Sequence, residues 1–287
     1  MPPLIRADIF LCQRHCLFNS FCPCLWSFGV EDPFQDASFD RAWEGIEVFF
    51  GGFIFGEVFG KVGWNVKGFH TVEYLLFGEN NDRVVTDLTP RELEYLTGLT
   101  QELVDVSGAL QASWTTAPAG GGQSYRDVFA TAGQAGNTAY PSLSAAAQEI
   151  LVGMSAICDE VANGKIADPY DAHDPNLVES QFSFNSQDDF ANNLRSVLNA
   201  YTGDVIDAGS TGRGLDELVK LTYPGLDARF HLELDDAIAK INAIPRPFRT
   251  AITTPASYPA IEAAQAAVRT VQATIDGDLT TEILGAR

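Results

Sequence analysis

The sequence has no run of about 18 consecutive apolar residues, the pattern that would indicate a transmembrane helix. Strict alternation of apolar and polar residues, which is typical of a half-buried strand, is also nearly absent. Basic residues are scarce, because 18 Lys and Arg stand against 38 Asp and Glu, for a formal net charge of -20. This field repels phosphate groups and attracts cations, so nucleic acid and anionic membrane surfaces are not expected partners.

Cysteine is absent from most of the chain, and four of the five cysteines crowd into the first 24 residues, at positions 12, 16, 22 and 24. Their spacing does not match the paired C-x2-C units of structural zinc sites. Polar residues 13–15 interrupt the only candidate apolar core of a signal peptide, so no clean signal peptide is found. We interpret residues 1–37 as an atypical, Cys-rich segment, for which an incorrect or shifted start is one explanation. Cys158 is expected to pack as a small apolar side chain.

The remaining chain shows helical patterns. Thr89 and Glu92 flank Pro90 in the arrangement of a helix N-terminus, and leucines and a valine follow at helical spacing from Leu93 to Leu110, which predicts one buried face. A long helix is expected over 142–163 with Gly164 as its C-cap, followed by a loop over 167–183. Further helices are expected at 41–50, 68–77, 124–133, 188–201, 215–221, 226–244 and 256–275.

These elements predict an all-α protein of two packed helical bundles. We place the boundary between the bundles at the glycine-rich link near residue 117. The predicted parts are an N-terminal segment over 1–37, a first bundle over 38–116 and a second bundle over 117–287. With 46% hydrophobic and 20% charged residues, the chain can build a core of ordinary size.

The most pointed chemical feature is the pair His70 and Glu73. Residues three apart lie on one helical face, so an imidazole and a carboxylate can converge on one cation. Helix surfaces often produce H-x-x-E by chance, but here the next four residues, 74–77, are apolar or aromatic and predict burial. Burying the pair is costly unless its members bond each other or a metal ion.

Two further polar clusters are candidates for a site. Glu44 and Glu47 are also three apart and lie among aromatic residues. They are either metal ligands or surface groups, and in the second case one of them can pair with Arg41. The stretch over 179–186 leads into the next helix, and its polar side chains either cap that helix or line a cleft.

Four stretches together resemble the imelysin-like family. GFHTVEYLLFG at 68–78 is similar to the GxHxxE signature of that family, and RAWEGIEVFFG at 41–51 resembles its upstream segment. VESQFSFNS at 178–186, continuing to Arg195, and AIPRPFR at 243–249 resemble segments of its second half. The resemblance covers 38–276 and has its motifs in the right order.

The resemblance implies two helical bundles in a bacterial protein that is exported to the periplasm or cell surface. There it would serve iron acquisition, and its expected partners are the metal ion and a membrane iron-uptake system. It implies a metal site with His70 and Glu73 as ligands and Glu47 as the third, and iron as the ion, with zinc as the alternative. Further cleft-lining candidates are Glu44, Glu179, Ser183, Asn185, Asp189 and Arg195. The long first helix of the family is not visible, and only 16 residues separate Gly51 from Gly68, so the first bundle is expected to be incomplete.

Two other functions stay open. The family was first described as metallopeptidases, but a zincin needs a second helical histidine four residues away, and the other three histidines, at 15, 173 and 231, are distant from His70 in sequence. We therefore assign no catalytic residue and favour a binding protein. A carbohydrate- or peptide-binding module is the third possibility, with Trp43, Trp64 and Tyr74 as stacking surfaces or as core residues.

Overall fold

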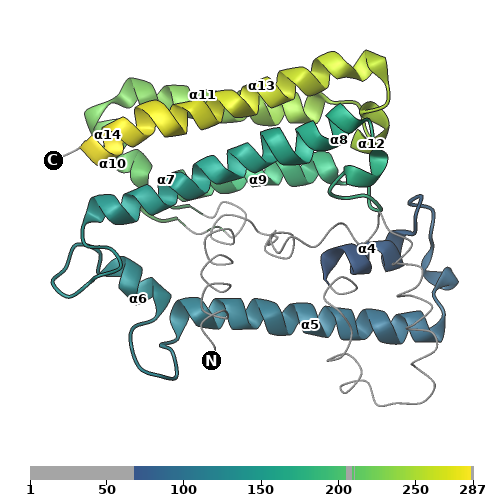
Figure 1. Ribbon diagram of the computed structural model, residues 1–287, viewed down its shortest axis with the longest axis horizontal. Helices are drawn as coiled ribbons and strands as arrows, with labels where there is room; N and C mark the ends of the chain where they lie inside the picture. Colours follow the sequence, from purple (N-terminus) through teal and green to yellow (C-terminus); the bar gives the residue numbers. More distant parts are fainter. Residues whose placement is uncertain (1–67, 205–208, 210, 286–287) are drawn as a thin grey trace. The chain divides into compact units, whose positions relative to one another are not determined.

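The computed structural model describes residues 68–204, 209 and 211–285. These residues contain helices and no β-strand, so the all-α prediction is confirmed (Figure 1). The α-helices are α4 (Phe69–Phe77), α5 (Pro90–Thr115), α6 (Tyr125–Ala130), α7 (Leu143–Asp159), α8 (Ala167–Ala172), α9 (Ser186–Thr202), α10 (Leu215–Thr222), α11 (Pro224–Ala243), α12 (Phe248–Ala251), α13 (Tyr258–Thr274) and α14 (Thr280–Gly285). Short 3-10 segments are η3 (Val85–Asp87), η5 (Pro175–Leu177) and η7 (Pro255–Ser257), and π-helical segments are η4 (Glu160–Ile166) and η8 (Ile275–Leu279). The helix expected at 41–50 lies outside the described residues.

The described residues form two compact units. The bundle unit contains 126–179 and the described part of 185–285, and the α4–α5 unit contains 68–125 together with 180–184. In the bundle unit, α7, α9, α11 and α13 pack in a closed ring in which each helix contacts the next (Figure 1). Their inner faces carry fully buried side chains at helical spacing, among them Leu194, Tyr201, Phe230, Leu234 and Val268.

Cys158 lies in this core and is fully buried, as expected of a small apolar side chain. Burial raises the pKa of its thiol, and the nearby carboxylates of Asp276 and Asp159 raise it further. The thiol is therefore an inert packing group. Within the described residues, no helix combines the length and the apolar character that a membrane crossing requires.

The prediction that the helix beginning at α7 ends at Gly164 is wrong. It passes through η4 and continues as α8 to Ala172, and it ends at His173 in the left-handed conformation with φ 52°. A π-helical turn accommodates an extra residue, and it comes directly before the turn that contains Pro169, which has no N–H to donate to the helix. The first six residues of the loop expected over 167–183 are thus helical.

Two of the stretches that carry the family resemblance meet inside the bundle unit. The fully buried Gln187 donates from Nε2 to the carbonyl oxygens of Ile244 and Pro245, and its Oε1 accepts from the N–H of Phe248. Beside it, Arg246 donates two hydrogen bonds of 2.6 Å to the carboxylate of Asp188. The side chain of Gln187 therefore fixes the turn between α11 and α12.

In the α4–α5 unit, the start of α5 is as predicted. Thr89 Oγ1 accepts from the N–H of Glu92, Glu92 accepts from the N–H of Thr89 at 2.8 Å, and Pro90 is the first helical residue. The predicted buried face is only partly correct: Leu99 is fully buried, but Leu93 and Val106 are 45% and 50% exposed. Among the described residues, the helix that packs on α5 is α4, whose nine residues span about 14 Å against about 39 Å for the 26 residues of α5.

Replacing Thr89 by Ala is expected to lower the free energy of unfolding by about 1 kcal/mol, because the first turn of α5 loses its side-chain cap. Urea denaturation monitored by far-UV circular dichroism measures the loss. Thr100→Ala in the middle of α5 is the control and is expected to stabilise slightly through its helix propensity. Equal stability of the two variants would contradict the capping role.

Candidate metal site

The site is built on α4, a nine-residue helix between two glycines. Gly68 and Gly78 both have positive φ angles, 102° and 71°, so the chain enters and leaves the helix in conformations that L side chains rarely adopt. Leu75 is fully buried and packs with Tyr95 and Leu99 of α5, which sets the rotation of α4 about its axis. This rotation places His70 and Glu73 together on another face of the helix.

His70 and Glu73 converge as the i, i+3 spacing predicts. Nδ1 of His70 lies 3.1 Å from Oε2 of Glu73, and the two side chains are 36% and 12% exposed. The carboxylate is therefore sheltered, while the imidazole remains accessible to a ligand from solvent. In metal sites with bonds of about 2.0–2.2 Å, neighbouring ligand atoms also lie about 3 Å apart, so the observed pair is compatible with binding to one cation.

The second oxygen of Glu73 is bound by a segment 110 residues further along the chain. Oε1 accepts from the N–H of Phe182 at 3.1 Å, from the N–H of Ser183 at 2.7 Å and from the hydroxyl of Ser183 at 2.7 Å. These three donors belong to the turn over 180–184, which is part of the α4–α5 unit. Two successive backbone N–H groups and a hydroxyl together form a small anion receptor, and Glu73 occupies it.

The turn over 180–184 has further contacts besides those with Glu73. Phe182 is buried, and its ring packs edge-on against Tyr74 with 5.1 Å between ring centroids. Asn81 donates to the carbonyl oxygen of Ser183 at 2.8 Å, and Phe184 has a left-handed backbone with φ 62° and donates its N–H to Ser180. A left-handed bulky residue is strained and persists only where surrounding contacts impose it.

Electrostatics favour the ionised form of Glu73. Burial opposes ionisation, but the hydrogen bonds from His70 and Ser183 outweigh it and hold the pKa of Glu73 below its ordinary value of 4.5. Ionisation therefore stabilises the fold. This contribution is fully present above about pH 4.5 and is lost as the pH falls through the lower pKa of the folded state.

The stability difference between the wild type and Glu73→Gln is accordingly expected to shrink as the pH falls from 7 to 3, because the wild-type carboxyl becomes protonated. Urea midpoints at several pH values measure this difference, and Glu94→Gln at an exposed position of α5 serves as the control. A Glu73→Gln difference that is constant or grows in acid would contradict the charged hydrogen bonds.

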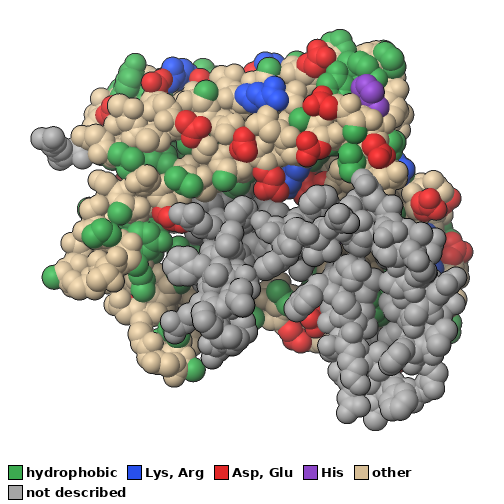
Figure 2. All heavy atoms as spheres, in the orientation of Figure 1, with side chains coloured by type: hydrophobic (Ala, Val, Ile, Leu, Met, Phe, Trp, Pro, Cys, Tyr) green, Lys and Arg blue, Asp and Glu red, His purple; other side chains and the backbone are tan. Residues whose placement is uncertain are grey.

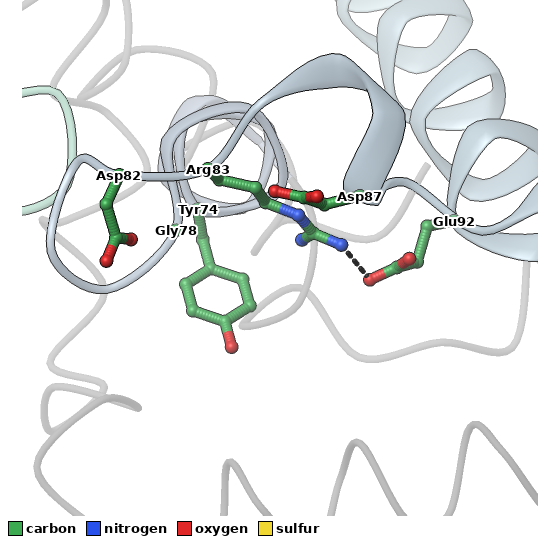
Figure 3. Close-up of a pocket in the computed structure, with 6 residues that line it drawn as sticks. All are labelled: Tyr74, Gly78, Asp82, Arg83, Asp87 and Glu92. Atoms are coloured by element: carbon green, nitrogen blue, oxygen red, sulfur yellow. Dashed lines mark hydrogen bonds and ion pairs between the residues drawn. The ribbon is translucent and has the colours of Figure 1, made fainter.

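A hollow of about 420 Å³ lies beside α4 (Figure 3). Its lining residues are Tyr74, Gly78, Asp82, Arg83, Asp87 and Glu92. The guanidinium of Arg83 points to Glu92 and is paired with it, and Asp87 accepts from the N–H of Val84. Hydrogen bonds from Arg83 and Thr89 outweigh partial burial and lower the pKa of Glu92. These contacts join the turn after α4 to the start of α5 and stabilise the site helix.

The remaining predicted site residues have other partners or lie outside the described residues. Glu44 and Glu47 belong to the second group, so the third metal ligand stays a prediction. In the bundle unit, Glu179 binds Lys165 at 2.7 Å and Asn185 donates to Asp189 at 2.9 Å. Arg195 donates to Asn192 at 2.6 Å. Within the described part of the chain, no three His, Cys, Asp or Glu side chains are arranged to hold a metal ion.

The two other described histidines have structural contacts. His173, which falls in the loop expected over 167–183, ends α8, where Nδ1 lies 2.9 Å from the carbonyl oxygen of Ile252 and its ring stacks on Tyr258. His231 lies inside α11, where its Nε2 is 3.6 Å from Oδ1 of Asp227. Acidic side chains are scattered over the face of the molecule in Figure 2, with fewer basic ones, in line with the net charge of -20.

Sequence comparison connects this arrangement with known proteins. The family profile described as Imelysin matches residues 54–275. Iron-regulated protein A of Synechococcus elongatus is 31% identical over 213 residues, which are 73% of this chain and 56% of that protein. The chain thus spans about half the length of this curated relative.

Two solved structures are similar. A protein from Parabacteroides distasonis, described provisionally as an iron-regulated protein A precursor, aligns with a TM-score of 0.70 and 25% identity over 95% of this chain and 76% of that one. An imelysin peptidase from Bacteroides ovatus aligns with a TM-score of 0.53 and 28% identity over 61% of this chain and 49% of that one.

Proposed function

The chain belongs to the imelysin family, and from this premise we propose that it is an extracytoplasmic metal-binding protein that serves iron uptake or handling. The observation that carries the proposal is the contact between His70 and Glu73 on the helix that bears the GxHxxE signature. The names of the relatives support a connection with iron, since two of them are described as iron-regulated. Export and a membrane uptake partner are parts of the same proposal.

The donor chemistry fits such an ion. An imidazole nitrogen and carboxylate oxygens suit iron, manganese and zinc, and the net charge of -20 raises the local concentration of cations. His70 and Glu73 would hold the metal, with Glu47 as the predicted third group. The bound ion would supply a Lewis-acidic, redox-capable centre in the case of iron, and the protein would supply the sheltered ligands.

Titration calorimetry with ferrous, manganous and zinc salts tests the proposal. His70→Ala is expected to weaken binding at least about a hundredfold, because a direct ligand is lost and even supporting residues cost about tenfold or more. His231→Ala is the matched control: His231 and Asp227 are 35% and 12% exposed, nearly the same as the His70–Glu73 pair. Equal affinity of the wild type and His70→Ala would remove the proposal.

A metallopeptidase is the second candidate, because one structural relative is described as an imelysin peptidase. This function requires chelator-sensitive cleavage of an unfolded protein substrate that Glu73→Gln abolishes. Our proposal expects the wild type to cleave the substrate no faster than the His70→Ala variant does. Among the described residues, no second histidine accompanies His70.

A further inference from the structure

Two tyrosines, a histidine and a glutamate lie together at one end of the bundle unit. Tyr170 lies in the last turn of α8 and His173 is the C-cap of that helix, while Tyr258 and Glu262 lie near the start of α13. A spacing of four places Tyr258 and Glu262 on one face of α13. Figure 1 shows α8 at the end of the bundle unit where α13 begins. We call these four residues the tyrosine cluster.

The side chains of the tyrosine cluster contact one another. The hydroxyl of Tyr170 donates to Oε1 of Glu262 at 2.8 Å. The ring of Tyr170 packs edge-on against His173 and Tyr258, with 5.8 and 5.2 Å between ring centroids, and His173 stacks on Tyr258 at 5.3 Å. His173 and Glu262 are exposed and the two tyrosines are half-buried, so an ion from solvent can reach the cluster.

The imidazole of His173 is oriented by the backbone. Its Nδ1 lies 2.9 Å from the carbonyl oxygen of Ile252, which can only accept, so Nδ1 donates. In the neutral ring the lone pair is therefore on Nε2. A hydrogen bond from one ring nitrogen to a backbone carbonyl is a common arrangement in metal-binding histidines, because it fixes the tautomer and the orientation of the ring.

The oxygen atoms of the cluster suit a cation of high charge. Partial burial, the hydrogen bond to Glu262, and the charges around the phenol, including that of Asp171, raise the pKa of Tyr170 to about 12. The phenol is therefore neutral at neutral pH, and a metal ion has to displace its proton. Phenolate and carboxylate are hard oxygen ligands, which a hard trivalent ion prefers. Their separation of 2.8 Å is typical of neighbouring ligand atoms on one ion.

We propose that the tyrosine cluster is a second metal site, which takes ferric iron through the phenol oxygen of Tyr170 and the carboxylate of Glu262. Tyr258 and Nε2 of His173 are the further ligands. On binding, the O–H bond of Tyr170 breaks as the oxygen bonds the iron, the proton passes to solvent, and the iron stays ferric. The cluster lies within the bundle unit and shares no residue with the site on α4.

Titration with ferric nitrilotriacetate tests this site by colour, because a phenolate bound to ferric iron absorbs visible light through charge transfer. We expect a visible band in the wild type and in His70→Ala, and tyrosine ring vibrations in resonance Raman spectra excited within that band. Tyr170→Phe keeps the packed ring and removes the ligand oxygen, so the band should weaken and ferric affinity should fall at least about tenfold. Glu262→Gln should weaken ferric binding in the same way.

Tyr223→Phe is the control, because Tyr223 is an exposed tyrosine of the same unit, and it should keep the band. Far-UV circular dichroism checks that each variant is folded. A purely structural role of Tyr170 would alter stability and produce no colour in the wild type.

Two results would overturn the inference: no visible band in the wild type, or a band of unchanged strength and affinity in Tyr170→Phe. A band that Tyr170→Phe keeps and His70→Ala loses would also overturn it and assign the iron to α4, in support of the proposed function. A band that depends on Tyr170, together with equal calorimetric affinities of the wild type and His70→Ala for ferrous, manganous and zinc ions, would refute the proposed function and support the tyrosine cluster.

Discussion

Gln187→Leu is expected to lower the free energy of unfolding by about 3 kcal/mol, although the new side chain has similar volume and is apolar. Gln187 is fully buried, and its amide satisfies the carbonyl oxygens of Ile244 and Pro245 and the N–H of Phe248. Leucine leaves these backbone groups buried without partners, and each such group costs about 1–3 kcal/mol, part of which local rearrangement recovers.

Urea denaturation monitored by far-UV circular dichroism measures this loss. Gln272→Leu on α13 is the matched control, because its amide makes one exposed hydrogen bond of 3.3 Å to Asp159, and its effect is expected to stay within about 0.5 kcal/mol. Similar stability of both variants would show that the turn between α11 and α12 does not depend on the glutamine.

Glu73→Ala is expected to release the turn over 180–184 and to destabilise the α4–α5 unit by about 2–3 kcal/mol. The substitution deprives Phe182 N–H, Ser183 N–H and the Ser183 hydroxyl of a charged acceptor, and such bonds contribute about 1.5–3 kcal/mol each before water replaces some of them. Hydrogen exchange followed by mass spectrometry should show faster exchange in peptides that cover 180–184.

The exposed Glu94→Ala is the control for this experiment and should leave exchange in that turn unchanged. Peptides from α9 and α11 report the integrity of the bundle unit and should exchange at wild-type rates in both variants. If the 180–184 peptides of Glu73→Ala stay as protected as in the wild type, the three hydrogen bonds to Glu73 do not hold the turn.

Local signals in the sequence were sufficient where the structure depends on neighbouring residues. Thr89, Pro90 and Glu92 predict the start of α5 because a capping box is formed within four residues. Helical patterns likewise predict helices at 142–163 and 188–201, where α7 and α9 lie. Glycine was a less certain signal: Gly78 ends α4 as predicted, whereas Gly164 lies within a continuous helix, since its backbone can adopt either conformation.

The predicted burial along α5 illustrates a second limit. The spacing of its apolar residues defines a face, but burial depends on what covers that face, and among the described residues the helix that packs on α5 is the short α4. For the same reason the contacts of His173 with Ile252 and Tyr258 were not predictable, because they join residues about 80 positions apart.

In the candidate site too, contacts between neighbouring residues were predictable and contacts between distant segments were not. The convergence of His70 and Glu73 follows from a spacing of three on a helix and was predicted. The partners of Glu73 could not be derived, because two of the three donors are backbone N–H groups, which every residue except proline carries. Asn81 was missed as well, and its only signal was asparagine in a turn, where it is common.

The most direct test of the account is a crystal structure of the protein soaked with ferrous or zinc ions, with anomalous diffraction recorded at the absorption edge of the metal. The account predicts an anomalous peak at about 2.0–2.2 Å from a ring nitrogen of His70 and beside the carboxylate of Glu73. A well-ordered His70 with no peak beside it, at metal concentrations that occupy other sites on the protein, would contradict it.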